Sequence, residues 1–522
     1  MKRSLLFLTI LILFACKKDV LNQEETNPNT SLPQLITKEA SDLTGYSVTI
    51  GGSLIKEGAS SITEAGFVVD TISGPTVEKN LNKFKRTIDS IGNLHLIIID
   101  IPPDKTFYLR AYGKNSAGIG YGNEIHFTSK KENVYNGDVD LTTQQQVIDF
   151  GSKHYTRING SLTITGSVTD LLPLQALTVI EYALNVQQTT QLKDFKGLDN
   201  LEATNHAGFF HGMRFENNQA LISFEGLQNL IGNSGSFYII NNPELTSLNG
   251  LNKLSYNHFG DFAIHTCNRL KTLKGLENLA WIDGSLNLQG NGQLTDITAL
   301  SNLKTITDRI YLLNNQLLEK VDGLEKITKL EALEITNNYK LRDLQGLRNL
   351  DTLNSLRLLG VNEIRDLTAF SNIKELQYLT VQDNVSLIDF TGLTNLEKIT
   401  GRFTLFMNTK LRNFSGMKKL TSLHSISIES NHSMINMEGL NSVKEIIADA
   451  YSIGIGANNN LESLDGLENL IRVNGDIQIA ANPKLHNFCA LVPLFKTGWS
   501  NWFLTEANLY NPSISQAIVK CK

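Results

Sequence analysis

Apolar residues recur at a fixed spacing over most of this chain of 522 residues. The stretch LEALEITNNYKL, residues 330–341, carries apolar side chains at its first, fourth and sixth positions, an asparagine at the ninth and a leucine at the twelfth. Similar stretches return mostly every 23 to 25 residues. A period of about 20 to 30 residues is typical of a solenoid, in which each repeat forms one coil. The pattern predicts such a solenoid over residues 135–490.

The asparagine of this motif marks a position, the asparagine slot, that recurs in about 14 coils. Ten of its fourteen residues are asparagine. The slot residues are Ser167, Thr189, Asn218, Asn242, Cys267, Asn291, Asn315, Asn338, Val361, Asn384, Asn408, Asn431, Asn458 and Asn482. The two apolar residues before each slot, such as Leu333 and Ile335, are expected to face inward from one strand. The asparagine would then turn the chain and satisfy backbone groups of neighbouring coils.

A glycine eight residues after the slot is a second landmark, and a leucine usually follows it, as in Gly275-Leu276 and Gly392-Leu393. A glycine held in register supplies a backbone turn that other residues resist. The motif L-x-x-L-x-I-x-x-N-x-x-L followed by GLxNL resembles leucine-rich repeats and, more closely, the receptor L domain. That resemblance implies a flattened, right-handed β-solenoid.

Both ends of a solenoid need caps, because no coil can bury its apolar face alone. Residues 140–153 combine the possible helix N-caps Thr142 and Thr143 with apolar Val147 and Phe150, which predicts a short capping helix. Residues 491–522 break the repeat and are expected to form the C-terminal cap.

Residues 34–130 alternate apolar and polar positions in stretches such as YSVTIGGSLI and LHLIIIDI, with turn residues between them. This alternation predicts a β sandwich, so the whole chain is expected to be dominated by β structure. The stretch IPPDKTFYLRAYGKNSAGIGYG resembles the signature of fibronectin type III domains through Pro103, Thr106, Tyr108 and Arg110. The resemblance implies an Ig/fibronectin-like sandwich with a tyrosine corner, in which the ring of Tyr108 is buried and its hydroxyl bonds to nearby backbone.

The first residues have the order of an export signal. Lys2 and Arg3 precede an apolar run shorter than the roughly 20 residues that span a bilayer. The run ends in LFAC, which resembles the lipobox of bacterial lipoproteins. The resemblance implies that residues 1–15 are a signal peptide and that Cys16 is acylated, so that the lipid anchors the protein to a membrane. The alternative is an ordinary signal peptide followed by a chance cysteine.

Residues 16–33 are polar and rich in asparagine and proline, which is typical of a flexible tether. The stretch CKKD at its start resembles short charged signals that send lipoproteins outward. We therefore expect a lipid-anchored protein of the cell envelope, exposed on the surface of the outer membrane.

Four cysteines are present: Cys16, Cys267, Cys489 and Cys521. Export permits disulfides. Cys489 and Cys521 enclose the C-terminal segment, and a bridge between them would hold a chain end that otherwise frays. We expect that disulfide, which leaves Cys267 unpaired.

Charge and motif content argue against several classes of partner. Loss of Lys2 and Arg3 would lower the formal charge from −5 to −7, and acidic and basic residues are interspersed. The basic stripe typical of nucleic-acid binding is absent from the sequence. No CxxC or HExxH spacing suggests a metal, and no glycine-rich phosphate loop follows a predicted strand. We expect no nucleic acid, metal or cofactor.

Residues that flank the second buried strand position are expected to face outward in two columns. The upstream column is Thr163, Asn185, Arg214, Tyr238, Ala263, Asn287, Tyr311, Glu334, Arg357, Thr380, Thr404, Ser427, Gly454 and Gln478. The downstream column is Thr165, Gln187, Glu216, Ile240, His265, Gln289, Leu313, Thr336, Leu359, Gln382, Phe406, Glu429, Gly456 and Ala480.

The two columns argue against catalysis. Glycoside hydrolysis needs two carboxylates about 5 to 9.5 Å apart. Glu216, Glu334 and Glu429 lie five and four coils apart, about 24 and 19 Å at a strand spacing of about 4.8 Å. We interpret His265 and Cys267 as an outward histidine and a buried cysteine rather than as a base and its nucleophile.

The columns instead offer aromatic, amide and cationic side chains on a rigid face, which favours recognition of a protein or glycan. The candidate binding residues are Tyr238, His265, Asn287, Gln289, Tyr311, Arg357 and Phe406. The sequence thus predicts a non-catalytic surface lipoprotein that binds or adheres through its solenoid. The alternatives are a polysaccharide-acting β-helix enzyme and a structural stalk of the cell envelope, in which the aromatic residues only stabilise the strands.

Overall fold

The structure, a computed structural model, describes residues 31–41, 43, 47–99, 101–204 and 212–521. It divides the chain into two compact units, Met1–Lys131 and Glu132–Lys522. The predicted signal peptide, Cys16 and most of the predicted tether lie outside the described residues.

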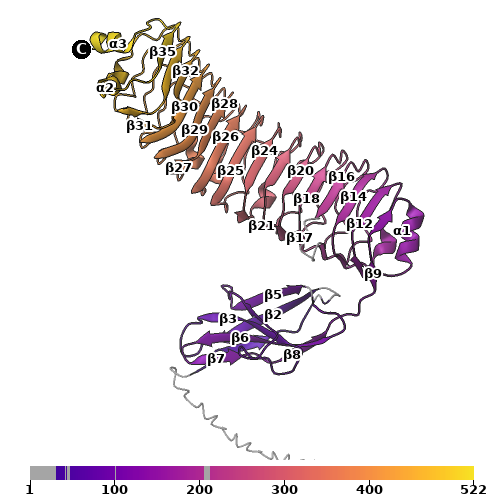
Figure 1. Ribbon diagram of the computed structural model, residues 1–522. Helices are drawn as coiled ribbons and strands as arrows, with labels where there is room; N and C mark the ends of the chain where they lie inside the picture. Colours follow the sequence, from indigo (N-terminus) through magenta and orange to yellow (C-terminus); the bar gives the residue numbers. More distant parts are fainter. Residues whose placement is uncertain (1–30, 42, 44–46, 100, 205–211, 522) are drawn as a thin grey trace, which may run out of the picture. The chain divides into compact units, whose positions relative to one another are not determined.

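The first unit is a β sandwich (Figure 1). One antiparallel sheet has the order β1-β2-β5, and the other has the order β4-β3-β6-β7 with β8 paired to β6. The strands are β1 (Gln34–Thr37), β2 (Ser47–Lys56), β3 (Glu64–Asp70), β4 (Asn82–Lys85), β5 (Asn93–Ile99), β6 (Thr106–Asn115), β7 (Gly118–Tyr121) and β8 (Ile125–Thr128). Val48 of one sheet and Phe67 and Leu109 of the other are fully buried in a shared core.

The tyrosine corner expected at Tyr108 is wrong. Strand β6 alternates, so Phe107 and Leu109 face the core while Tyr108 points to the opposite side. Tyr108 is half-buried, its ring lies 6.0 Å from that of His126, and its hydroxyl makes no hydrogen bond to any described residue. The fully buried tyrosine is Tyr112, whose hydroxyl donates to Glu64 at 2.8 Å.

The second unit is a β-solenoid of about 15 turns over residues 134–506, which confirms the predicted fold class. Figure 1 shows its parallel strands stacked one coil after another. The main sheet contains, in order, β10 (Val139–Leu141), β12 (Leu162–Gly166), β14 (Leu184–Thr189), β16 (Met213–Glu216), β18 (Phe237–Ile240), β20 (Phe262–His265), β22 (Leu286–Gln289), β24 (Arg309–Leu313), β25 (Lys329–Thr336), β26 (Thr352–Leu359), β27 (Glu375–Leu376), β28 (Tyr378–Gln382), β29 (Lys398–Phe406), β30 (Ser422–Glu429), β31 (Glu445–Ile446), β32 (Tyr451–Gly456), β33 (Arg472–Val473), β34 (Asp476–Ala480) and β35 (Phe503–Glu506).

A second parallel sheet runs along the first half of the solenoid. Its strands are β9 (Val134–Asn136), β11 (Arg157–Asn159), β13 (Val179–Ile180), β15 (Ala203–Thr204), β17 (Gly232–Ser234), β19 (Tyr256–His258), β21 (Trp281–Ile282) and β23 (Thr305–Ile306). Short 3-10 helices in the return leg are η1 (Leu172–Leu174), η2 (Thr298–Leu300), η3 (Gln345–Leu347), η4 (Thr368–Phe370) and η5 (Cys489–Leu491). One apolar core extends through the whole unit, from Val139 to Ala517.

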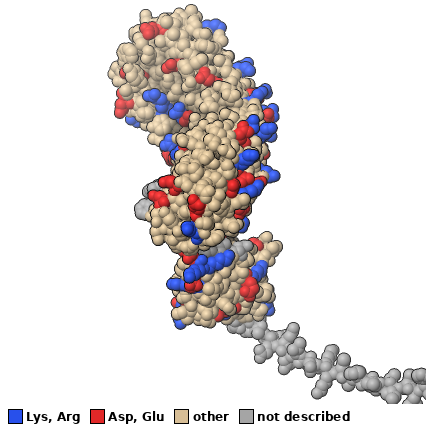
Figure 2. Space-filling model, turned by 90° about the vertical axis from the view of Figure 1, so that its right-hand side faces the viewer, with Lys and Arg blue, Asp and Glu red and all other residues tan. Residues whose placement is uncertain are grey.

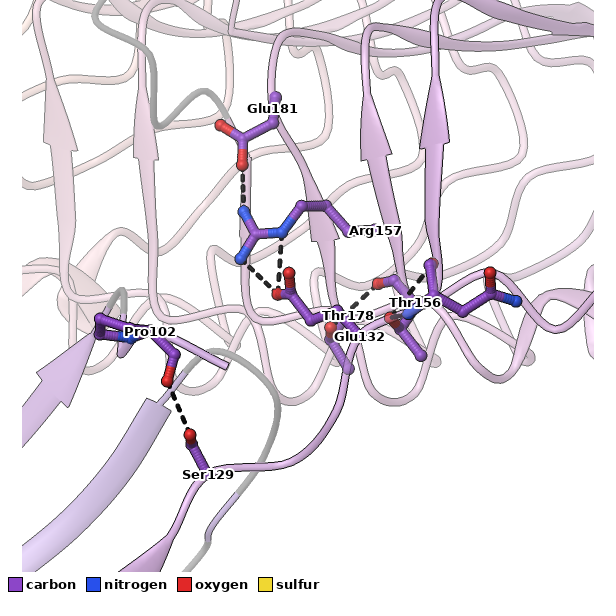
Figure 3. A network of polar contacts seen from close by, with 8 residues as sticks. Pro102, Ser129, Glu132, Thr156, Arg157, Thr178 and Glu181 are labelled. Carbon is purple, nitrogen blue, oxygen red and sulfur yellow. Dashed lines mark hydrogen bonds and ion pairs between the residues drawn. The ribbon is translucent and has the colours of Figure 1, made fainter. Parts of the chain in front are cut away.

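The N-terminal cap is the predicted helix, α1 (Gln144–Gly151). Thr143 is its N-cap, and Gln146 completes a capping box with it. Beside the cap, Arg157 on β11 lies between Glu132 and Glu181 (Figure 3) and forms ion pairs with both, at 2.5 Å to Glu132. All three side chains are largely buried, so removal of Arg157 would leave two buried carboxylates without their ion-pair partner.

The C-terminal cap contains α2 (Val492–Lys496) and α3 (Ile514–Lys520), and the predicted disulfide joins Cys489 to Cys521. The solenoid extends one coil beyond the predicted boundary at residue 490, because β35 pairs with β34. Asn508 occupies the asparagine slot of this added coil, where its Oδ1 accepts the backbone N–H of Asn482 at 3.0 Å.

The asparagines of the slot are buried, and the side chain of each bonds to the coil before it. The Oδ1 of Asn338 accepts the backbone N–H of Asn315 at 3.1 Å, and its Nδ2 donates to the carbonyl of Leu312 at 2.6 Å. The same pattern repeats at Asn315 and Asn408. This asparagine ladder supplies the partners that backbone groups lose when a chain turns inside an apolar core.

The backbone turns at the residue before each slot. From Gly166 to Ala507, that residue has a φ between 50° and 68° in every coil. Later in the coil, Gly275 has a φ of 115°, and a Cβ there would lie 2.2 Å from the carbonyl oxygen of Leu248 in the previous coil. The glycine landmark therefore serves both the turn and the close approach of two backbones.

Asn338→Leu is expected to destabilise the second unit, because it leaves the N–H of Asn315 and the carbonyl of Leu312 buried without partners. Each such group costs about 1 to 3 kcal/mol. Chemical denaturation measures the loss, with Asn268→Leu as the matched control, since Asn268 is exposed and accepts only one long hydrogen bond, at 3.4 Å. Equal stability of the two variants would contradict the role of the ladder.

Candidate functional site

The strand register confirms that the predicted columns share the outer face of the main sheet. Tyr311 pairs with Asn287 on one side and with Glu334 on the other, and Glu334 pairs with Arg357. The same pairing continues along the downstream column, for example from His265 to Gln289. Side chains of successive coils in one column are therefore neighbours.

The strands of the main sheet lengthen in the second half of the solenoid. Strands β16, β18, β20 and β22 have four residues each, whereas β25, β26 and β30 have eight and β29 has nine. In β25, Leu330 and Leu333 are buried, while Glu331 and Ala332 between them are not. Two successive outward residues mean that the strand bends there.

This bend adds a third outward column, the corner column, that the repeat motif does not predict. Its members are Arg309, Ala332, Ser355, Tyr378, Arg402 and Ser425. A trough of about 990 Å³ follows the corner column from β24 to β32. Its floor is low because Ala332, Ser355, Ser425 and the neighbouring Gly401 have small side chains or none. The volume is at the upper end of the range of ligand sites.

Exposed tyrosines are among the residues that line the trough. Tyr378 is 45% exposed and Tyr451 is 70% exposed, whereas the neighbouring phenylalanines Phe390 and Phe403 are fully buried. A Cβ at Gly401 would lie 2.8 Å from a ring carbon of Tyr378. The ring thus lies close to bare backbone, while the residue remains exposed to solvent.

The charged groups of the trough are partly paired. Arg357 lies 3.5 Å from Glu334, which also accepts a hydrogen bond from Thr336 at 3.3 Å. The Oε2 of Glu331 accepts a hydrogen bond from the Nδ2 of Asn354 at 2.7 Å.

Two further arginines flank these pairs. Arg309 pairs with Asp308 at 3.1 Å. Arg402 is exposed and forms no ion pair with any described residue. On the face seen in Figure 2, acidic and basic side chains are likewise interspersed along the second unit.

The trough includes only two of the seven predicted binding residues, Tyr311 and Arg357. Tyr238 lies nearer the N-terminal end, where the guanidinium of Arg214 is 4.8 Å from its ring centroid. Gln289 and Phe406 are half-buried members of the downstream column and do not line the trough.

His265 and Asn287 lie on adjacent strands, β20 and β22, away from the trough. The Nε2 of His265 and the Oδ1 of Asn287 are buried, and neither has a hydrogen-bond partner within bonding geometry. Burial lowers the pKa of His265, and the nearby Asn287 side chain opposes that shift only in part. The two residues are half-buried and lie outside the trough, and their role in binding stays a prediction.

The residues that the sequence interpretation missed are Tyr378, Arg402 and Tyr451. Tyr378 and Arg402 directly precede the first apolar residue of the LTV and FTL segments of their coils. Both residues are exposed at that position. Large side chains occur at this position only from residue 309 onward, for example at Arg309, Tyr378 and Arg402, and that change was the available signal.

Cys267 lies in the asparagine slot and is fully buried, as the sequence interpretation expected. Its Sγ lies 3.5 Å from the backbone carbonyl oxygen of His265. Burial raises the pKa of the Cys267 thiol to about 11. A thiol that stays protonated and buried is a poor nucleophile.

Among the described residues, no group of three or more His, Cys, Asp or Glu side chains is placed to hold a metal ion. No protein-family model matches the chain, and no curated protein matches it by sequence.

Cys267 is expected to resist iodoacetamide in the folded protein at about pH 8, because the thiolate forms only as the pH approaches the raised pKa and burial blocks access. Labelling should become complete after denaturation. Peptide mass spectrometry distinguishes Cys267 from Cys16. Rapid labelling of native protein at neutral pH would instead indicate an accessible, activated thiol.

Proposed function

We propose that the chain is an acylated lipoprotein of the cell envelope with two functional parts: a lipid anchor at Cys16 and a solenoid that binds an extended ligand. The anchor is supported by the LFAC stretch and the polar segment that follows it. No helix among the described residues is long and apolar enough to cross a membrane.

The binding role is supported above all by the trough along the corner column. A concave surface of about 990 Å³ that combines exposed tyrosines with arginines and carboxylates is suited to hold a ligand. The sheet beneath it is continuous and its strands are tied by the asparagine ladder, so the site is rigid before the ligand arrives. Rigid sites lose less entropy on binding.

The proposal includes a finer domain assignment. The sandwich is a fibronectin type III-like module that spaces a receptor L domain-like solenoid from the membrane. The recurring L-x-x-L-x-I-x-x-N motif and the IPPDKTFYLRAYGKNSAGIGYG stretch support it. Surface exposure on the outer membrane is part of the same proposal and rests on the CKKD stretch.

Hydrolysis of a polysaccharide is the second candidate function, because the trough contains Glu331 and Glu334 on one strand. Both carboxylates already have partners in the next coil, Asn354 and Arg357, which favours a binding role. Release of reducing ends from a bound polysaccharide, lost in Glu331→Gln and Glu334→Gln, would establish the enzyme instead.

Cys16→Ala is expected to abolish acylation and to leave the protein as an unprocessed or soluble precursor. The apolar run before Cys16 is shorter than the roughly 20 residues needed to span a bilayer. Detergent-phase partitioning measures the change. Partitioning identical to that of the wild-type protein would contradict a lipid anchor at this cysteine.

Tyr311→Ala and Arg357→Ala are each expected to weaken ligand binding by about tenfold, which corresponds to about 1.4 kcal/mol. Stability should change little, because Arg357 is 47% exposed in its side chain and exposed ion pairs contribute little. The ligand is first identified by probing arrays of envelope proteins and glycans with the full chain. Its affinity for each variant is then measured.

Lys274→Ala and Lys326→Ala, on the exposed return leg, are the controls and should bind like the wild type. Binding that survives the trough substitutions but is lost when residues 34–129 are deleted would assign the site to the sandwich. Absence of any ligand would favour the structural stalk.

A further inference from the structure

The charge of the trough is balanced. Three arginines, Arg309, Arg357 and Arg402, face three carboxylates, Glu331, Glu334 and Asp449. A site for a strongly acidic polymer would carry an excess of cations, as phosphate-binding surfaces do. The balance therefore favours a ligand without net charge that offers many hydrogen-bonding groups.

The exposed tyrosines favour a ligand with flat, weakly polar faces. The ring of Tyr378 lies against Gly401, which restricts its movement, and the residue is exposed, so the ring can serve as a platform. Tyr451 lies three coils further on, about 14 Å away at a strand spacing of about 4.8 Å. A sugar ring presents C–H groups on its face and hydroxyls around its edge, so it can stack on such a platform while its hydroxyls meet Arg and Glu side chains.

The length of the trough favours a polymer over a single sugar. Its lining residues run from Arg309 on β24 to Tyr451 on β32, which is six coil steps or about 29 Å. A protein ligand fits less well, because Glu and Asp are depleted in protein interfaces, whereas three carboxylates line this trough.

We infer that the trough binds an uncharged, extended glycan that lies across the strands, with Tyr378 as a stacking platform. The inference rests on the proposed binding function and specifies its ligand. Arg357, Arg402 and Glu334 then act as donors and acceptors for hydroxyl groups. Arg402 is the best placed of these, because it has no ion-pair partner among the described residues.

The test uses the full chain in detergent with neutral β-glucan and α-mannan polymers, and with alginate as a uronate polymer of similar length. We expect binding to at least one neutral polymer, with a Kd that changes by less than about twofold between low and high salt, because screening acts only on charged pairs. Tyr378→Ala should weaken this binding by about tenfold or more, and Tyr378→Phe should preserve it because the ring remains.

Tyr339→Ala is the matched control, since Tyr339 is 43% exposed and lies outside the trough. Equal melting temperatures of the variants show that the fold is intact.

Salt-sensitive binding to alginate alone, or glycan binding that is unchanged in Tyr378→Ala, would overturn the inference. If only a protein binds, and Tyr378→Ala weakens it, the inference fails while the proposed function stands. If no glycan or protein responds to any trough substitution, both fail.

Discussion

The hydrogen bonds of the buried asparagine ladder are the constraint on which the second unit depends. Each coil must turn inside an apolar interior, where an unpaired backbone group is costly. The side chain of Asn338 replaces the missing partners by accepting from one residue of the previous coil and donating to another. Asparagine suits this position because its short side chain carries both a donor and an acceptor.

The ladder also explains why the coils are so uniform. A side chain that bonds two fixed backbone groups of its neighbour permits little variation in the height or rotation of one coil on the next. The left-handed residue before each slot and the glycine landmark follow from the same geometry. Cys267 and Val361 occupy the slot without an amide, yet the backbone N–H of each still donates to the asparagine that follows, so single gaps are tolerated.

The candidate site is a consequence of this regularity. Strands held in one register align outward side chains into columns, so a ligand meets a repeating surface rather than isolated residues. The second sheet ends at β23, and the longer strands that follow bend outward at residues such as Ala332. The trough therefore forms only in the second half, although the asparagine ladder extends through both halves.

The sequence by itself determined the class of fold, the slot, the capping helix at Thr143 and the Cys489–Cys521 disulfide. The fold class and the slot depend on burial that repeats with each coil and so leaves a periodic signal, whereas the capping helix and the disulfide depend on local sequence features. The added coil at Asn508 was hidden because the segments around it do not follow the repeat.

Only the tertiary structure decided which outward residues meet. Tyr311 and Arg357 line the trough together with Tyr378, Arg402 and Tyr451. Tyr238 and Phe406 lie outside the trough. The tertiary structure also turned Tyr108 away from the sandwich core. The physical reason is that an exposed side chain is not constrained by the repeat. Whether it lines a trough depends on the bend of the strand beneath it, and that bend is set by the packing of the whole coil against its neighbours.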